Sequence, residues 1–113
     1  MDVDMVARRL AQGSARYLDC RSEQEFATGV VAGAVNCPFP HNNHVAVEPD
    51  DFVADVEGEF GRDDTILLGC RSGVRSLLAA EVLLSAGFSD VTNVAGGILA
   101  WEAAGHPIAP FKG

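Results

Sequence analysis

Short apolar runs alternate along the chain with longer stretches in which apolar residues recur at helical spacing. The runs have the length of buried strands and predict strands over 15–20, 35–37, 66–68 and 91–94, with Val3 opening a short edge strand. The helical spacing predicts helices over 5–12, 22–27, 49–60, 76–86 and around 98–104. This alternation predicts an α/β fold with a mostly parallel sheet and helices on both of its faces.

Residues that start and stop helices stand at the ends of these stretches. Asp4 is expected to cap the first helix, and Gly13 to end it. Ser22 and Glu25 have the spacing of a capping box, in which each side chain bonds the other residue's backbone N–H. Pro49 and the two acidic residues after it suit the first turn of a helix.

The predicted strand over 66–68 and the predicted helix over 76–86 are joined by a tight loop that holds one cysteine, one glycine and two arginines. A strand that turns directly into a helix leaves several backbone N–H groups pointing into one cup, which favours an anion. Gly73 allows a positive φ in this loop, and Arg71 and Arg75 add permanent positive charge. The sequence therefore predicts an anion site built around Cys70.

Cys70 is the candidate nucleophile of that site. A free thiol titrates near pH ~8.5, but a helix N-terminus and cationic neighbours lower this to between ~3.5 and ~7.5. The alternative is a buried structural cysteine, which is common in proteins. A structural cysteine needs neither flanking arginines nor a glycine, so the pattern favours the nucleophile.

The length of 113 residues predicts one domain spanning residues 1–113. With 48% hydrophobic and 21% charged residues, the chain is expected to form a packed core. The net charge of −8 disfavours nucleic acid and anionic lipid as partners. No apolar run is long enough to span a membrane, and the acidic N-terminus does not resemble a signal peptide, so a cytoplasmic protein is expected. An odd count of three cysteines argues against a disulfide framework.

The loop from Cys70 to Arg75 resembles the active-site loop of the rhodanese family of sulfurtransferases, which has the form Cys-x-x-Gly-x-Arg. Four residues separate Cys70 from Arg75. Related phosphatases and arsenate reductases on the same fold have a loop one residue longer, which admits a tetrahedral oxyanion. The shorter loop implies a pocket for a terminal sulfur atom.

The resemblance extends over nearly the whole chain. It includes the Asp-x-Arg of Asp19 and Arg21, and the Gly-Gly-x-x-x-Trp that begins at Gly96 and Gly97, and it departs from the family's usual residues at Val30 and Ala32. It implies a three-layer α/β/α fold with a five-stranded sheet ordered 1-5-4-2-3. We interpret Asp19 and Arg21 as ties between a strand end and neighbouring loops, the alternative being a solvated surface ion pair.

Two further groups of residues leave alternatives open. Cys20 and Cys37 stand where the family has aliphatic residues, which favours a plain core role for both, although a redox role for Cys20 remains open. His41 and His44 have a spacing that could bind a metal, but no third and fourth ligand at the usual spacing follows. We therefore expect no metal, and interpret this segment as a wall of the cleft over Cys70, where either histidine could aid proton transfer.

The resemblance implies a sulfurtransferase that moves sulfane sulfur from thiosulfate or a similar small anion to a thiol, cyanide or protein acceptor. The sulfur would be held as a persulfide on Cys70, with no other cofactor. Arg71, Ser72, Gly73, Val74 and Arg75 would bind the anion, supported by Asp19, Arg21, Gly96 and Gly97. The alternatives are a non-catalytic rhodanese-like binding or regulatory module and, disfavoured by the loop length, a phosphatase or arsenate reductase.

Overall fold

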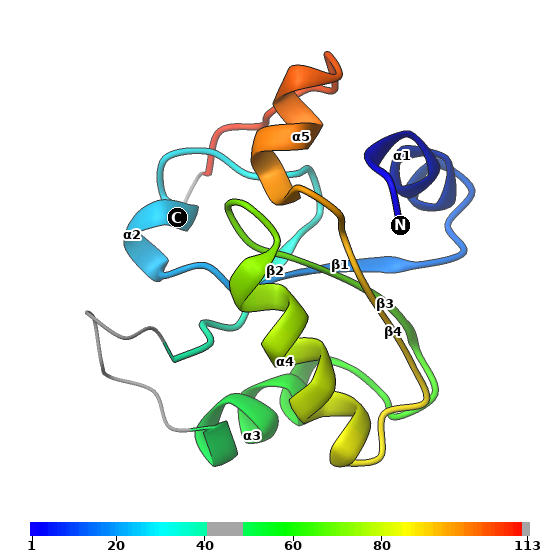
Figure 1. Ribbon diagram of the computed structural model, residues 1–113, viewed down its shortest axis with the longest axis vertical. Coiled ribbons are helices and arrows are strands. Elements are labelled where there is room, and N and C mark those ends of the chain that lie inside the picture. The colour runs from blue at the N-terminus through cyan, green and yellow to red at the C-terminus, as the bar shows by residue number, and fades with distance from the viewer. Residues whose placement is uncertain (41–48, 112–113) are drawn as a thin grey trace.

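A computed structural model of the protein describes residues 1–40 and 49–111. Helices and strands alternate along the chain (Figure 1). In chain order they are α1 (Val3–Ala11), β1 (Arg16–Asp19), α2 (Glu23–Phe26), β2 (Val35–Asn36), α3 (Pro49–Glu59), β3 (Thr65–Gly69), α4 (Val74–Ser85), β4 (Asp90–Asn93) and α5 (Gly97–Ala103). His41 and His44, for which the sequence analysis left a metal or proton-transfer role open, lie outside the described residues.

The four strands of the described chain form one parallel sheet in the order β2-β1-β3-β4. β3 lies between β1 and β4, with Leu18 paired to Leu68 on one side and Leu68 paired to Asn93 on the other. Asp19, the last residue of β1, pairs with Gly69, the last residue of β3. The carboxyl ends of β1 and β3 therefore meet at one edge of the sheet, where open α/β sheets usually bind their ligands.

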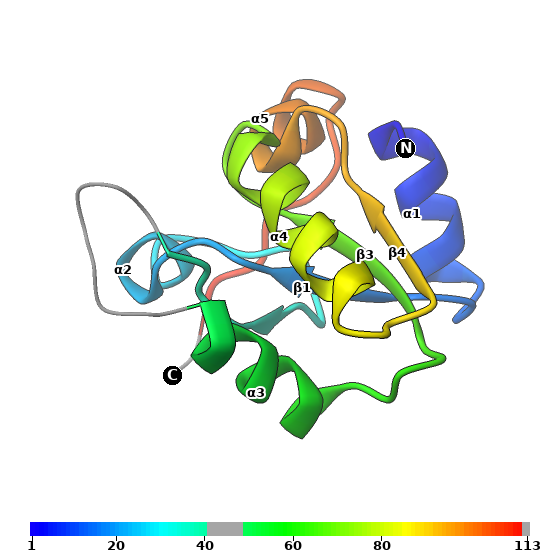
Figure 2. The ribbon, with the colours of Figure 1, turned by 60° about the horizontal axis from the view of Figure 1, so that its bottom comes forward.

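Helices cover both faces of the sheet, so the fold is the predicted three-layer α/β/α arrangement (Figures 1 and 2). Strand residues alternate between the two faces, as the period of two requires. One face packs on α3 and α4 through Leu18, Ile66, Leu68, Phe52, Val56, Ala79 and Leu83. The other face packs on α1 and α5 through Tyr17, Leu67, Val94, Val3, Val6, Ile98 and Trp101.

The predicted edge strand at Val3 is wrong, because Val3 is the first residue of α1. The Asp2 side chain caps this helix by accepting a hydrogen bond of 2.9 Å from the Met5 backbone N–H, so the expected cap at Asp4 is also wrong. Val3 and Val6 lie one helical turn apart on the same side of α1, and both side chains are buried. Without a strand at Val3, the remaining order agrees with that implied by the family resemblance.

The other elements lie close to where the sequence places them. The capping box of Ser22 and Glu25 is present and begins α2. α4 starts at Val74 rather than Ser76, so part of the predicted anion-binding loop is helix. Within the described residues, no helix has the length and apolar character that crossing a membrane requires.

Candidate active site

The loop after β3 lies at the middle of the sheet's carboxyl edge. β3 ends at Gly69, and the chain turns over residues 70–73 before α4 begins. Gly73 stands at the N-cap of α4 with a φ of 95°, a left-handed conformation that glycine adopts without strain. Gly73 has no side chain that could cap this end of α4, so backbone N–H groups there can bind another acceptor.

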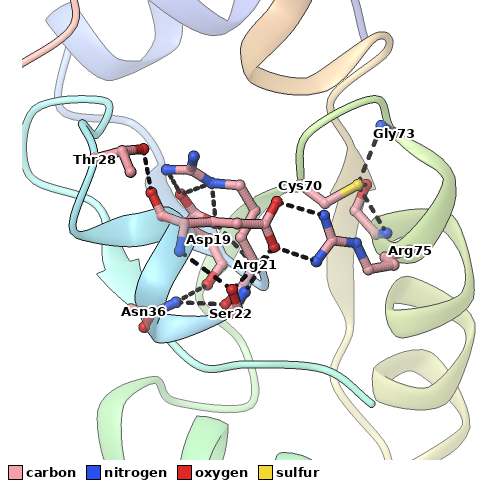
Figure 3. A network of polar contacts seen from close by, with 10 residues as sticks. Asp19, Arg21, Ser22, Thr28, Asn36, Cys70, Gly73 and Arg75 are labelled. Carbon is pink, nitrogen blue, oxygen red and sulfur yellow. Dashed lines mark hydrogen bonds and ion pairs between the residues drawn. The ribbon is translucent and has the colours of Figure 1, made fainter. Parts of the chain in front are cut away.

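The acceptor that these groups bind is the sulfur of Cys70. Its Sγ accepts hydrogen bonds from the Gly73 N–H at 3.1 Å and from the Ser76 N–H and Oγ at 3.4 Å each. Figure 3 shows the Cys70 side chain directed toward Gly73 under the loop. Only 1% of the Cys70 surface is exposed, so the sulfur lies at the bottom of the loop rather than on the molecular surface.

These contacts favour the thiolate form of Cys70. The pKa of its thiol is lowered to about 4, first through a hydrogen bond with the Cys20 thiol and then through the bonds from Ser76 and Gly73. Burial acts in the opposite direction and is outweighed. The same pairing and its own burial raise the pKa of Cys20, which keeps its proton. At neutral pH the site therefore holds one thiolate beside one thiol.

The turn between β4 and α5 supports the loop from the other side. Ile98 N–H donates to the Cys70 carbonyl oxygen at 2.9 Å, and Leu99 N–H donates to that of Arg71 at 3.1 Å. Gly97 has a φ of 59°, and a Cβ there would overlap the Cys70 and Arg71 carbonyl groups. Gly96 and Gly97 therefore permit the close approach of two backbone segments.

Ser76 and Asn93 form a polar pair beneath the sulfur. The buried Ser76 hydroxyl contacts both the Cys70 Sγ at 3.4 Å and the Asn93 Oδ1 at 2.5 Å, and its single proton can be donated to only one of them at a time. Asn93 Nδ2 in turn donates to the Gly73 carbonyl oxygen at 3.3 Å. The end of β4 thus holds both the hydroxyl and the loop glycine in place.

The Arg75 side chain is bound to a residue of α2. Its two terminal nitrogens bond the two carboxylate oxygens of Glu25 at 2.7 and 2.9 Å (Figure 3). The Arg75 guanidinium lowers the pKa of Glu25 to about 2. Arg75 therefore ties the loop to α2. Arg71, Ser72 and Val74 are exposed around the loop.

Asp19 and Arg21 form a buried ion pair at the end of β1. Arg21 Nε bonds both oxygens of Asp19 at 3.1 and 3.0 Å, and Arg21 Nη2 donates to the Gly29 carbonyl oxygen at 2.7 Å (Figure 3). The side chains are 2% and 5% exposed, so the alternative of a solvated surface pair is wrong. Asn36 Nδ2 also bonds the carbonyl oxygens of Asp19 and Arg21, which ties β2 to the same strand end.

Three residues that contact this arrangement were missed as site residues by sequence reasoning. Ser76 was taken only as a helix residue and Asn93 only as the end of a strand, while Cys20 was interpreted mainly as core. A signal existed for both, since Ser76 is a polar residue at the start of the predicted helix after the loop and Asn93 is a polar residue within the predicted strand over 91–94. Among residues 1–40 and 49–111, no cluster of histidine, cysteine or acidic side chains could hold a metal.

The chain matches one known protein family, and its relatives include named members of that family. A model of the Rhodanese-like domain matches residues 2–104. Thiosulfate sulfurtransferase 16, chloroplastic, from Arabidopsis thaliana is 40% identical over 103 residues, covering 90% of this chain and 86% of that protein. Human thiosulfate:glutathione sulfurtransferase is 34% identical over 95 residues, covering 81% of this chain and 83% of that protein.

Two other plant relatives are 41% identical, and this chain spans only 53% of the length of each. In structure, the chain resembles the crystal structure of the Alr3790 protein from Anabaena sp., with a TM-score of 0.83 and 24% identity over 100% of this chain and 94% of that one. At that identity the likeness shows the fold alone.

Proposed function

The chain belongs to the Rhodanese-like domain family, and we propose that it is a sulfurtransferase that carries sulfane sulfur as a persulfide on Cys70. The relatives named thiosulfate sulfurtransferase and thiosulfate:glutathione sulfurtransferase support sulfur transfer in general. Thiosulfate or a similar small anion is the proposed donor, and a thiol, cyanide or protein thiol the proposed acceptor. The proposal includes a cytoplasmic location, no nucleic acid or membrane partner, and no cofactor beyond the persulfide.

The observation that carries the proposal is the Cys70 Sγ, which accepts hydrogen bonds from the Gly73 and Ser76 N–H groups. Together with the contact to the Cys20 thiol, these bonds lower the pKa of Cys70 and favour its thiolate. In the first step, this thiolate attacks the outer sulfur of the donor, the bond between the two donor sulfurs breaks, and sulfite leaves with the electron pair. In the second step, an acceptor thiolate attacks the terminal sulfur of the persulfide and restores the Cys70 thiolate. The Gly73 and Ser76 N–H groups stabilise the anionic sulfur throughout.

The other site residues act by position in this proposal. Arg71, exposed in the loop, attracts the anionic donor, and Ser72 and Val74 are exposed next to it. Arg75, through Glu25, holds the end of the loop on α2. The buried Asp19 and Arg21 pair and the glycines at 96 and 97 hold the flanking backbone.

Mass spectrometry after treatment with thiosulfate tests the proposal. We expect an adduct of one sulfur atom on Cys70, which disappears when a thiol acceptor or cyanide is added. Cys70→Ser is expected to form no adduct and to show no turnover with any donor and acceptor pair. An adduct confined to Cys20 or Cys37, or normal turnover by Cys70→Ser, would contradict the assignment. An intact protein without turnover on any pair would favour the binding-module alternative.

A further inference from the structure

Cys20 lies beside Cys70 because of the register of two parallel strands. Asp19 pairs with Gly69, and the Cys20 N–H donates to the Gly69 carbonyl oxygen at 2.9 Å, so the ladder continues into the pair of residues that follows. The strand period of two places Leu18 and Cys20 on the same face as Leu68 and Cys70. All four belong to the hydrophobic cluster beneath α3 and α4.

This placement suits a disulfide. Neighbouring strands lie about 4.7–4.9 Å apart, and disulfides join residues whose Cα atoms are usually about 4.4–6.8 Å apart. Both cysteines are free thiols in the structure. Cys20 is fully buried and Cys70 is 1% exposed, so the thiol that Cys70 meets without any opening of the fold is that of Cys20.

The third cysteine does not share this relationship with Cys70. Cys37 follows β2, which lies beyond β1 in the sheet, so one whole strand separates it from Cys70. Cys37 is also buried and belongs to the same hydrophobic cluster. It is therefore a matched control, a free buried cysteine in the same core that β1 separates from β3 and the loop after it.

We propose that Cys20 is the resolving thiol of Cys70, closing an intramolecular disulfide when a peroxide oxidises Cys70. The proposal rests on strand register and does not depend on the proposed sulfur transfer. If Cys20 only filled space in the core, an aliphatic side chain would serve equally well. The proposal gives a reason for a thiol at this position.

The chemistry balances with hydrogen peroxide as the only added oxidant. The Cys70 thiolate attacks one peroxide oxygen, the O–O bond breaks, and hydroxide leaves, which gives a sulfenic acid on Cys70. The Cys20 sulfur then attacks the Cys70 Sγ, the S–O bond breaks, and the Cys20 proton leaves with the hydroxyl group as water. Two thiol sulfurs are oxidised by one electron each, and the peroxide accepts both electrons.

The consequence is that oxidation of the active thiolate stays reversible. A low-pKa thiolate without a resolving partner proceeds to sulfinic and sulfonic acids, which ordinary thiols do not reduce. A Cys20–Cys70 disulfide is instead reopened by a small dithiol, which leaves as a cyclic disulfide and restores both thiols. The loop is inactive while the bond is closed, because the Cys70 sulfur is bonded to Cys20 and is no longer the thiolate nucleophile that attacks the donor.

The test treats the reduced protein with an equimolar amount of hydrogen peroxide in the absence of any sulfur donor, followed by alkylation, digestion and mass spectrometry. We expect the intact mass to fall by two hydrogen atoms, a cross-linked peptide to contain Cys20 and Cys70, and Cys37 to be alkylated. Dithiothreitol is expected to restore alkylation of all three cysteines. In a parallel sample that receives at least three equivalents of hydrogen peroxide, Cys20→Ser is expected to gain two or three oxygen atoms on Cys70, which dithiothreitol does not remove. Cys37→Ser is expected to close the disulfide like the parent.

Two results would overturn the proposal: oxygen adducts on Cys70 of the parent while Cys20 remains alkylated, or a disulfide that joins Cys20 to Cys37. Should Cys20→Ser fail to fold, the peptide map of the parent still decides between these outcomes. Persulfide formation with thiosulfate is measured on a separate, reduced sample. Either proposal can therefore fail without the other.

Discussion

The carboxylate of Glu25 binds the guanidinium of Arg75 through two parallel hydrogen bonds, although the residues lie 50 positions apart in the chain. Glu25 also accepts from the backbone N–H of Ser22 at 3.2 Å as part of the capping box of α2. Arg75 stands in the first turn of α4, next to Ser76, which contacts the active sulfur. One carboxylate thus begins a short helix and fixes the end of the loop around Cys70.

Glu25→Gln is expected to lower the free energy of unfolding by about 1 kcal/mol at neutral pH, because the pair is bidentate but partly exposed to solvent. The pKa of Glu25 in the folded protein is about 2, below its value in the unfolded chain. The charged pair therefore stabilises the fold fully above pH ~4.3 and loses this effect as the pH falls toward 2. Urea unfolding of parent and variant at several pH values measures the difference.

The control for this experiment is Glu23→Gln, which removes a negative charge from an exposed position of the same helix. We expect its difference from the parent to be under ~0.5 kcal/mol at neutral pH. If the difference in free energy of unfolding between Glu25→Gln and the parent stays constant down to about pH 2, the charge of Glu25 does not stabilise its contact with Arg75.

Asp19→Asn is expected to lower the free energy of unfolding by about 3–5 kcal/mol, because it leaves the buried guanidinium of Arg21 without a charged partner. The matched control is Glu57→Gln, whose ion pair with Arg62 is about half exposed on both sides and is expected to contribute under ~1 kcal/mol. Chemical unfolding of both variants gives the two values. Similar small losses for both would mean that Asp19 and Arg21 do not act as a buried tie.

Gly97→Ala is expected to destabilise the protein by several kcal/mol and to reduce sulfur transfer. The added Cβ would be strained at a φ of 59° and would overlap the carbonyl groups of Cys70 and Arg71. Gly13→Ala is the control, since Gly13 has a φ of 69° with no atom within 4 Å of the added Cβ. It is expected to cost only the backbone strain of about 1–2 kcal/mol. Equal losses would remove the argument for a close approach at Gly97.

Local sequence signals predicted the local features of this structure. The strand around Ile66, the loop from Cys70 to Gly73 and the capping box at Ser22 each depend on residues within a few positions of one another. Val3 was misassigned because a single apolar residue carries no period, whereas the buried pair of Val3 and Val6 beneath α1 does. Helix spacing was therefore the stronger signal at the N-terminus.

The contacts around the sulfur could not be predicted in the same way. The Cys20 contact depends on the register of β1 against β3, and Asn93 reaches Ser76 because β4 lies next to β3. A shift of one residue in either register would turn these side chains to the opposite face of the sheet. The family resemblance implied the strand order, but no spacing within the sequence fixes which residues stand side by side.

The thiolate of Cys70 is expected to persist down to about pH 4, where its thiol titrates in the folded protein. Ultraviolet absorbance of the thiolate, measured as the parent minus Cys70→Ser, should therefore fall with a midpoint near pH 4 rather than near the usual ~8.5. Cys20→Ala removes the largest favourable contact, and a hydrogen bond to a charged group contributes about 1.5–3 kcal/mol, so the midpoint should rise by about 1–2 pH units. Cys37→Ala should leave it unchanged, since Cys37 is separated from Cys70 by β1. A midpoint near pH 8 in the parent would mean that the loop amides and Cys20 do not hold a negative charge on this sulfur.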